Sequence, residues 1–271
     1  MMTNETLFFS GMSTSTLTPS LGGLLTPGAP ATTAASSIQE AASMFVPLEE
    51  VELLSKMASN GLQVLYRYTR KPHLYSASMT SIQLTLKNQG QDELTEVKIG
   101  AKTLAPGMTM HDFPSLASLP SGSSQTVTIG INFNDSTQSA KFDIVASGRV
   151  FTVQIQPVIG ELVRAVSMPE SVFDQEKNKL KGMNEVDANF KLPSAFSDDA
   201  GIRKKIYEIA NLIQVPTLES GLMKFSGQTT GNKYLVLVSL KLNDGQAVLN
   251  VNCEKIVIGN MLVKEIKSAF E

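Results

Sequence analysis

Apolar and polar residues alternate along most of the chain between Gly61 and Pro157. Successive side chains of a β-strand point to opposite faces of a sheet, so a period of two predicts strands with one buried face. Alternating runs begin at about residues 62, 82, 127 and 151, and turn residues such as Asn60-Gly61 punctuate them. Some seven or eight short strands fit this segment, so we predict an immunoglobulin-like β-sandwich over residues 44–158.

The period changes after Pro157, where helical spacing appears among further strands. We predict helices at 171–181, from Asp198 onward and at 258–270, the second with an apolar stripe of Ile202, Ile206, Ile209 and Ile213. Strands are predicted at 183–192, 222–229, 234–242 and 246–253, with a hairpin turn at Asn243-Asp244-Gly245. This order predicts an α/β platform subdomain over residues 159–271, an antiparallel sheet with helices on one face.

Residues 1–43 are dominated by Ser, Thr, Gly, Ala and Pro. Such a segment buries too little apolar surface to offset the entropy of ordering it, so we predict a flexible hinge or tail. Thr18 and Thr26 each precede a proline and are candidate phosphorylation sites.

Charge and cysteine content narrow the setting of the protein. A formal net charge of −2 without a basic stripe argues against nucleic-acid binding. The single cysteine, Cys253, excludes an internal disulfide and favours a reducing, cytosolic compartment. No Lys or Arg precedes Lys56, which speaks against a secretory signal, and no apolar run reaches the ~18 residues that span a bilayer, so direct membrane insertion is not expected.

Residues suited to catalysis are scarce. His73 and His111 are the only histidines, and neither has a carboxylate or cysteine at metal-ligand spacing. His111 and Asp112 are neighbours, but neighbours on a strand face opposite sides of the sheet. No phosphate-binding loop, nucleophile elbow or zinc motif is present, and Cys253 is interpreted as a buried thiol. We therefore expect a protein that is not an enzyme and uses no metal or cofactor.

Several blocks of the sequence are similar to the C-terminal appendage of the beta subunit of adaptor complex three, a beta-adaptin. The resemblance runs from about residue 45 to the C-terminus and includes part of a hinge. It rests on Phe45-Val46-Pro47, Gly61-Leu62, 81–86, Ile99-Gly100, 107–111, 135–138, Ile155-Gln156-Pro157, Gly160-Glu161-Leu162 and 182–185.

The resemblance implies a cytoplasmic vesicle-coat protein, peripheral on Golgi or endosomal membranes, that sorts cargo toward lysosomes and related organelles. Its partners would be short peptide motifs of accessory proteins and the other adaptor subunits. The latter would bind through a helical trunk that this chain lacks, so the chain is expected to be a fragment or a short isoform.

The resemblance also implies a peptide-binding pocket on the platform. The family strand Ala-x-Trp-Lys is similar to Ala188-Asn189-Phe190-Lys191 here, which places Phe190 at the Trp position and Lys191 at the Lys position. The family's pocket Tyr falls at Phe225, and a pocket Glu falls at Ser239. Phe keeps an apolar face but loses a polar group, and Ser removes a charged acceptor, so specificity is expected to differ. The alternative is that Phe190 and Phe225 are simply sheet-to-helix core.

Two other functional interpretations stay open at this point. The Ser/Thr-rich N-terminus is compatible with an extracellular adhesion module on a glycosylated stalk, with sequons at Asn4 and Asn134. A separate interpretation is a regulatory tail that is phosphorylated at Thr18 or Thr26.

Overall fold

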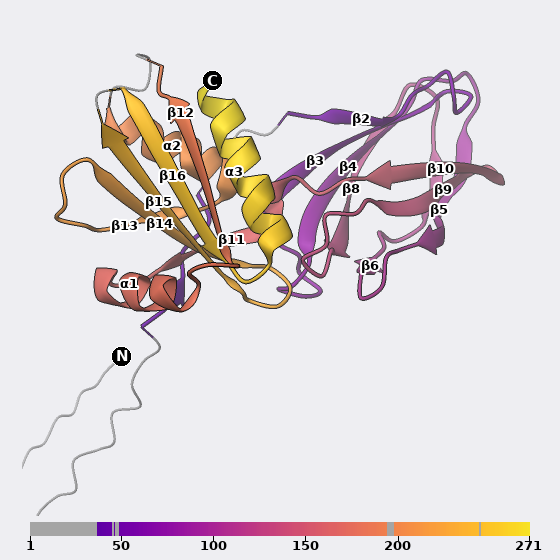
Figure 1. The fold of residues 1–271 in the computed structure, drawn as a ribbon. Coiled ribbons are helices and arrows are strands. Elements are labelled where there is room, and N and C mark those ends of the chain that lie inside the picture. The colour runs from indigo at the N-terminus through magenta and orange to yellow at the C-terminus, as the bar shows by residue number, and fades with distance from the viewer. Residues whose placement is uncertain (1–36, 45, 47–48, 194–197, 244) are drawn as a thin grey trace, which may run out of the picture. The chain divides into compact units, whose positions relative to one another are not determined.

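The computed structural model describes residues 37–44, 46, 49–193, 198–243 and 245–271, which belong to one compact unit (Figure 1). The predicted phosphorylation sites Thr18 and Thr26 and most of the predicted hinge lie outside the described residues. The same holds for Asp244 in the predicted hairpin turn.

The N-terminal half of the described chain is built from two antiparallel sheets, which confirms a β-sandwich. The first sheet has the order β2 (Val51–Leu54), β3 (Leu62–Pro72), β4 (Thr80–Asn88), β8 (Ser124–Asn132), β6 (Thr109–His111). The second has the order β10 (Arg149–Ile155), β9 (Ala140–Ala146), β5 (Leu94–Thr103), β7 (Leu116–Leu119). These are more strands than the seven or eight predicted, because β6 and β7 have only three and four residues and show no clear period.

The predicted alternation decides which side chains fill the sandwich. Val64, Ile82, Leu84, Ile129 and Ile144 are fully buried, whereas polar residues between them face outward. Each sheet therefore has one apolar face, and burying these two faces against each other forms the sandwich.

The second half is a seven-stranded antiparallel sheet. Its order is β1 (Gln39–Glu40), β11 (Val163–Ser167), β14 (Leu222–Thr229), β15 (Leu235–Asn243), β16 (Gln246–Cys253), β12 (Glu185–Lys191), and β13 (Ile213–Val215) also pairs with β14. The four strands predicted here are confirmed within one or two residues. β1 comes from the end of the segment predicted as a flexible hinge, so that end of the segment is ordered on the platform.

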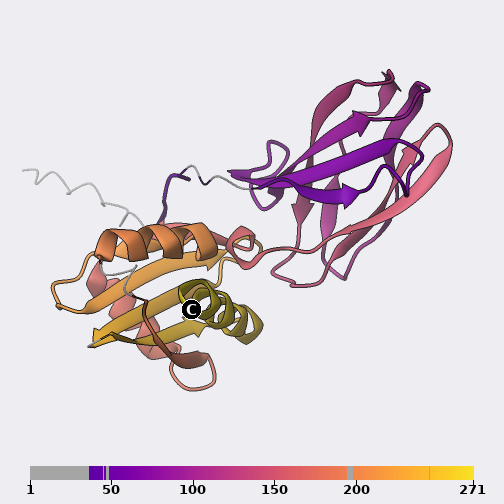
Figure 2. The same cartoon turned by 90° about the horizontal axis from the view of Figure 1, so that it is seen from above.

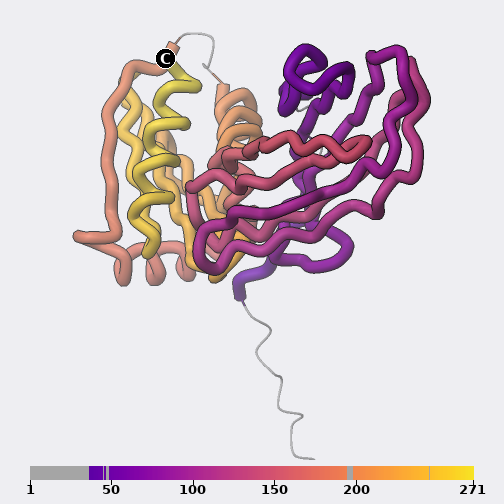
Figure 3. The backbone as a smooth tube through the Cα atoms, turned by 90° about the vertical axis from the view of Figure 1, so that its right-hand side faces the viewer, coloured from indigo at the N-terminus to yellow at the C-terminus, as the bar shows by residue number. Residues whose placement is uncertain are grey.

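Helices lie on both faces of the platform sheet, and the prediction of one covered face is wrong. On one face, α3 (Ile256–Phe270) packs beside α2 (Asp199–Ala210) and against β12 and β16 (Figure 3). On the other face, Phe173 of α1 (Glu170–Lys179) packs in a cluster with Leu237 of β15. Leu237 lies between Val236 and Val238, which point to the α2–α3 side. An apolar run of this kind marks a strand buried on both faces, which the prediction missed.

The bounds of α2 follow from its caps. The Asp198 side chain accepts a hydrogen bond from the Gly201 amide at 3.2 Å, as the predicted N-cap should. The helix ends at Ala210, because Asn211 adopts the left-handed region with φ of +53° and closes the last turn. Ile213, predicted on the apolar stripe of this helix, therefore lies in β13 instead.

A buried arginine joins the sandwich to the platform. Arg70 lies where the register of β3 shifts between Tyr68 and Pro72, and its φ of +56° marks an irregular backbone. Its guanidinium forms an ion pair with Glu161 and donates to the carbonyl oxygens of Tyr207, at 3.0 Å, and Glu208, at 2.6 Å. These carbonyls belong to the last turn of α2, where a cation also complements the helix dipole.

A buried aspartate makes the second junction. Asp135, in the turn after β8, is 1% exposed. Its carboxylate accepts hydrogen bonds from the Thr229 hydroxyl, the backbone amides of Gly231 and Asn232, and the Asn232 side chain, at 2.8–2.9 Å. The turn between β14 and β15 is therefore built around a side chain of the sandwich.

Candidate functional site

Two of the four predicted platform residues lie in the core. Phe190 is 4% exposed and stacks on Phe270 of α3, with ring centroids 6.0 Å apart. Phe225 is fully buried in the same apolar cluster. Both side chains face the side of the sheet that α2 and α3 cover, and this placement agrees with the alternative that they are sheet-to-helix core.

The other two residues lie on the opposite face, beside α1. Ser239 is directly across from Lys224 and Asn250, and its hydroxyl accepts a hydrogen bond from the Lys177 ammonium at 2.9 Å. Burial lowers the pKa of Lys177, and the Glu185 carboxylate opposes that shift. Lys191 alternates with Phe190 along β12 and is exposed. The sheet therefore does not bring the four residues together in one pocket.

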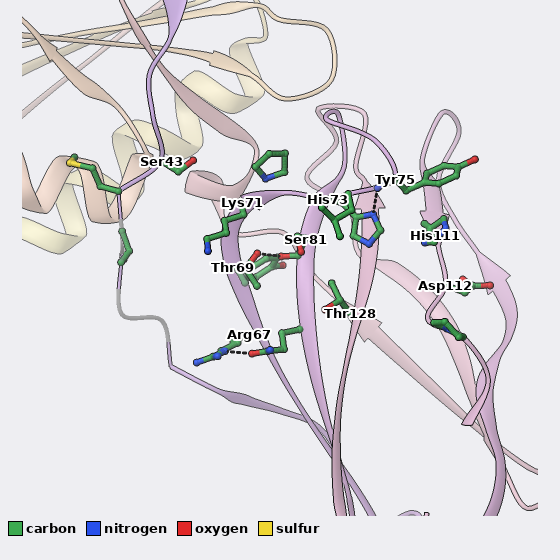
Figure 4. A pocket seen from close by; sticks show the side chains of 17 residues that line it. Ser43, Arg67, Thr69, Lys71, His73, Tyr75, Ser81, His111, Asp112 and Thr128 are labelled. Carbon is green, nitrogen blue, oxygen red and sulfur yellow. Dashed lines mark hydrogen bonds between the residues drawn. The ribbon is translucent and has the colours of Figure 1, made fainter. Parts of the chain in front are cut away.

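A hollow of about 1250 Å³ lies on the outer face of the five-stranded sandwich sheet. Neighbouring strands supply its floor through their outward-facing side chains, which Figure 4 shows. These are Arg67, Thr69 and Lys71 of β3, Ser81 and Gln83 of β4, and Thr128 of β8. We call this hollow the sandwich groove. Ser43, Met44 and Val46 form its border on the side of the N-terminal segment.

One end of the sandwich groove is aromatic. Tyr75 stacks on His111 with ring centroids 4.2 Å apart, and His73 lies 5.1 Å from the same imidazole. Leu74 is fully exposed and Tyr75 is 68% exposed, so both offer apolar surface to a ligand. Burial, and then the neighbouring His111, lower the pKa of His73 below its usual value.

The charge of the groove is positive. The Arg67 guanidinium donates to the Gln83 side chain at 2.6 Å and stays exposed, and Lys71 is exposed as well. The only carboxylate among the lining residues is that of Asp112, which forms an ion pair with Lys102 at 2.7 Å. The free charges are thus cationic and suit a ligand that carries carboxylates.

The histidine side of the groove depends on a glycine. A Cβ atom added to Gly130 of β8 would lie 2.7 Å from Cγ of His73. We expect Gly130→Ala to displace the His73 ring and to lower the free energy of unfolding by about 1–3 kcal/mol through overpacking. Urea unfolding, with histidine ring resonances as a local probe, measures both effects.

Gly259→Ala is the matched control, because a Cβ there meets its nearest atom at 3.7 Å and alanine favours the helix. This control should be as stable as the native chain or more stable. A Gly130→Ala variant with native stability and native histidine resonances would contradict the packing argument.

Sequence reasoning missed the sandwich groove. Arg67, Thr69 and Lys71 occupy the polar positions of an alternating strand, so a cationic outer face of β3 was detectable. The pairing of His73 with His111 could not be detected from the sequence, because it depends on where β6 lies in the sheet. In the sheet order, β4 and β8 separate β6 from β3.

Within the described residues, no three His, Cys, Asp or Glu side chains are grouped to hold a metal ion. Nor is any helix in the described part of the chain long and apolar enough to cross a membrane.

Comparison with known proteins gives two family matches. Residues 8–138 match the family of the C-terminal region of the clathrin-adaptor complex-3 beta-1 subunit, and residues 160–270 match the C-terminal domain of AP-3 complex subunit beta-1. The first match ends just before β9 of the sandwich, and the second begins close to the start of the platform.

Similar full-length proteins agree with these matches. The chain is 38% identical to AP-3 complex subunit beta-1 of Mus musculus over 237 residues, covering 87% of this chain and 21% of that protein. It is 38% identical to subunit beta-2 of Mus musculus over 231 residues, with 84% and 21% covered, and to subunit beta-1 of Homo sapiens over 256 residues, with 94% and 23% covered. The chain therefore spans about a fifth of the length of these relatives.

A solved structure, the GH20 exo-β-N-acetylglucosaminidase of Vibrio harveyi, aligns with 71% of this chain and 40% of its own. The TM-score is 0.21 and the identity 11%, so this likeness carries no inference about fold or activity.

Proposed function

Because this chain belongs to the family of AP-3 complex beta subunits and matches their C-terminal region, we propose that it is a non-enzymatic interaction appendage of a vesicle-coat adaptor. The appendage recruits accessory or regulatory proteins while cargo is sorted from endosomes or the trans-Golgi toward lysosomes and related organelles. The match to adaptor subunits favours this function over the extracellular adhesion module.

The observation that carries the proposal is the sandwich groove. It combines exposed cations, Arg67 and Lys71, with exposed apolar surface on Leu74 and Tyr75. An extended acidic peptide with one large apolar side chain satisfies both features. The carboxylates meet the cations on the floor, and the apolar side chain packs on Tyr75 at the aromatic end.

We assign the platform a secondary role in peptide recognition. Lys191 and Ser239 share the α1 side of the sheet, where Val248 is 39% exposed, and Phe190 and Phe225 support that sheet from the other side. A coat presents many copies of the appendage, so a micromolar peptide site of about −8 kcal/mol gains further binding from avidity. We also propose that the chain takes part in a complex with other adaptor subunits, because its relatives are subunits of the AP-3 complex.

Removing both features of the sandwich groove tests the proposal. We expect Lys71→Glu/Tyr75→Ala to lower affinity for acidic peptide partners from cytosol at least tenfold, because a truncated aromatic and a reversed charge act together. Partners captured on the immobilised chain are identified by mass spectrometry, and their affinities are then measured by isothermal titration calorimetry with synthetic peptides.

Lys87→Glu provides the matched control, because Lys87 lies on β4 outside the groove and undergoes the same charge change. A third variant, Lys191→Glu, reports on the platform face. Partners that bind the groove variant as tightly as the Lys87→Glu control would refute the sandwich groove. Partners lost only from Lys191→Glu would move the site to the platform.

A further inference from the structure

The platform sheet is closed at one edge by a very short strand from the N-terminal segment. In β1, Gln39 pairs with Ser167 and Glu40 with Val166 of β11, and the Ala41 amide donates to the Ala165 carbonyl at 2.9 Å. The opposite side of β11 pairs with β14. β11 thus keeps a partner strand even when β1 is absent, and only its outer edge would be uncovered.

Two side chains of this segment give the contact its specificity. Ile38 packs against the apolar cluster that contains Val166 and Phe173. Glu40 accepts hydrogen bonds from the Lys233 ammonium at 2.7 Å and from the Gln228 side chain at 2.8 Å. The edge of β11 therefore presents an apolar contact and, two residues further along the bound strand, a cation.

The segment is held lightly. The side chains of Glu40 and Lys233 are 47% and 44% exposed, a setting in which an ion pair contributes little. Gln39 and Glu40 are both exposed, and the regular pairing covers only these two residues. Leaving the edge requires no change in the sandwich, whose first strand starts at Val51.

We propose that the outer edge of β11 is a peptide-binding site that residues 38–41 occupy in cis. In their place the edge binds an extended segment of a partner protein that has a large aliphatic residue two positions before a carboxylate. Main-chain hydrogen bonds to an uncovered edge supply affinity, and the contacts now made by Ile38 and Glu40 supply specificity. This site is separate from the sandwich groove and does not depend on it.

The chemistry of the partner follows from the resident strand. An apolar side chain at the first position meets the cluster beside α1, and a carboxylate at the third position meets Lys233 and Gln228. A tethered occupant has an effective concentration in the millimolar range. A partner segment therefore binds well only when it makes more contacts than residues 38–41 or when these residues are released.

A fluorescein-labelled peptide of residues 35–44 (ASSIQEAASM) is the probe. Fluorescence anisotropy measures its binding to the native chain and to the full chain with Ile38→Asp/Glu40→Lys, which weakens the cis contact. We expect the variant to bind the peptide at least tenfold more tightly than the native chain does. The same two changes in the peptide should abolish binding, and Lys233→Ala added to the variant should weaken binding of the unmodified peptide at least threefold.

Two controls make the outcome decisive. Glu49→Lys makes the same charge change outside residues 38–41, and the peptide should bind this control no more tightly than it binds the native chain. Hydrogen exchange at the Ala41 amide shows whether the cis segment has left β11 in the variant. Equal affinity of native chain and variant overturns the proposal, and so does a released segment without peptide binding. A native chain that dimerises, with the peptide dissociating the dimer, would place a second copy on the edge and overturn the assignment to a partner protein.

Discussion

Replacing Arg70 by alanine is expected to lower the free energy of unfolding by about 3–5 kcal/mol. Both Arg70 and Glu161 are almost completely buried, with side chains 4% and 2% exposed. Removing one partner leaves an uncompensated buried charge and also deprives two carbonyls at the end of α2 of their donor. Urea unfolding followed by circular dichroism measures the loss. Arg67→Ala, an exposed arginine on the same strand, should change stability by no more than about 0.5 kcal/mol.

The same variant should show a stronger pH dependence of stability than the native chain does. Burial raises the pKa of Glu161 above its usual value of 4.5, and the Arg70 guanidinium opposes that shift. Without the guanidinium, the folded chain binds more protons at this site than the unfolded chain above pH 4.5. Stability of the variant should therefore fall as pH rises above 4.5 toward the raised pKa of the folded chain. Arg70→Ala/Glu161→Gln should regain part of the stability and lose this slope. A single variant with native stability at all pH values would show that the ion pair is dispensable.

Replacing Asp135 by alanine is expected to lower the free energy of unfolding by about 3–4 kcal/mol. The carboxylate accepts four hydrogen bonds, two of them from backbone amides of the turn between β14 and β15. Hydrogen bonds to a charged group contribute about 1.5–3 kcal/mol each, although such contributions are not additive within one group. Thermal and urea unfolding measure the change.

Asp135→Asn separates the carboxylate from the backbone conformation. Asp135 has φ of +54°, a region that aspartate and asparagine tolerate better than alanine does. The amide keeps one acceptor oxygen, so we expect Asp135→Asn to lower the free energy of unfolding by less than Asp135→Ala does. Asp143, whose carboxylate accepts from Thr152 across an exposed strand pair, is the control site, and Asp143→Ala should lose less than about 1 kcal/mol. An Asp135→Ala loss as small as this would contradict the proposed role of the turn.

Together the two junctions link the sandwich with the platform. Arg70 connects β3 with the end of α2, and Asp135 connects the turn after β8 with the turn after β14. Figure 2 shows the platform helices and sheet that receive these contacts. Partial disruption of either junction should therefore destabilise sandwich and platform as one cooperative unit. In that case, urea unfolding followed by circular dichroism and by histidine ring resonances should give coincident transitions.

The candidate sites illustrate how far local patterns reach. The resemblance to beta-adaptins indicated the family, which the family matches confirm, and the change of hydrophobic period after Pro157 indicated the two modules. The resemblance also pointed to Phe190 and Phe225, residues whose orientation depends on where α3 and α2 lie. Because Phe270 covers Phe190, a residue 80 positions later in the chain decides its exposure. The sandwich groove, by contrast, arises from residues on neighbouring strands and from the loop that follows β3.

Local sequence patterns were enough to specify many of the elements and the face that each one buries. A period of two specified β3, β4 and β8, and an Asp N-cap followed by apolar residues at helical spacing specified α2, since these signals depend only on nearby residues. The packing of whole elements decided which face of the platform sheet each helix covers, and it placed α1 on the face opposite α2 and α3. It also paired Arg70 with Glu161 and brought residues 38–41 to the edge of β11. These contacts join residues about 90 to 190 positions apart, and no local pattern records such distances, because they are set by the packing of whole sheets.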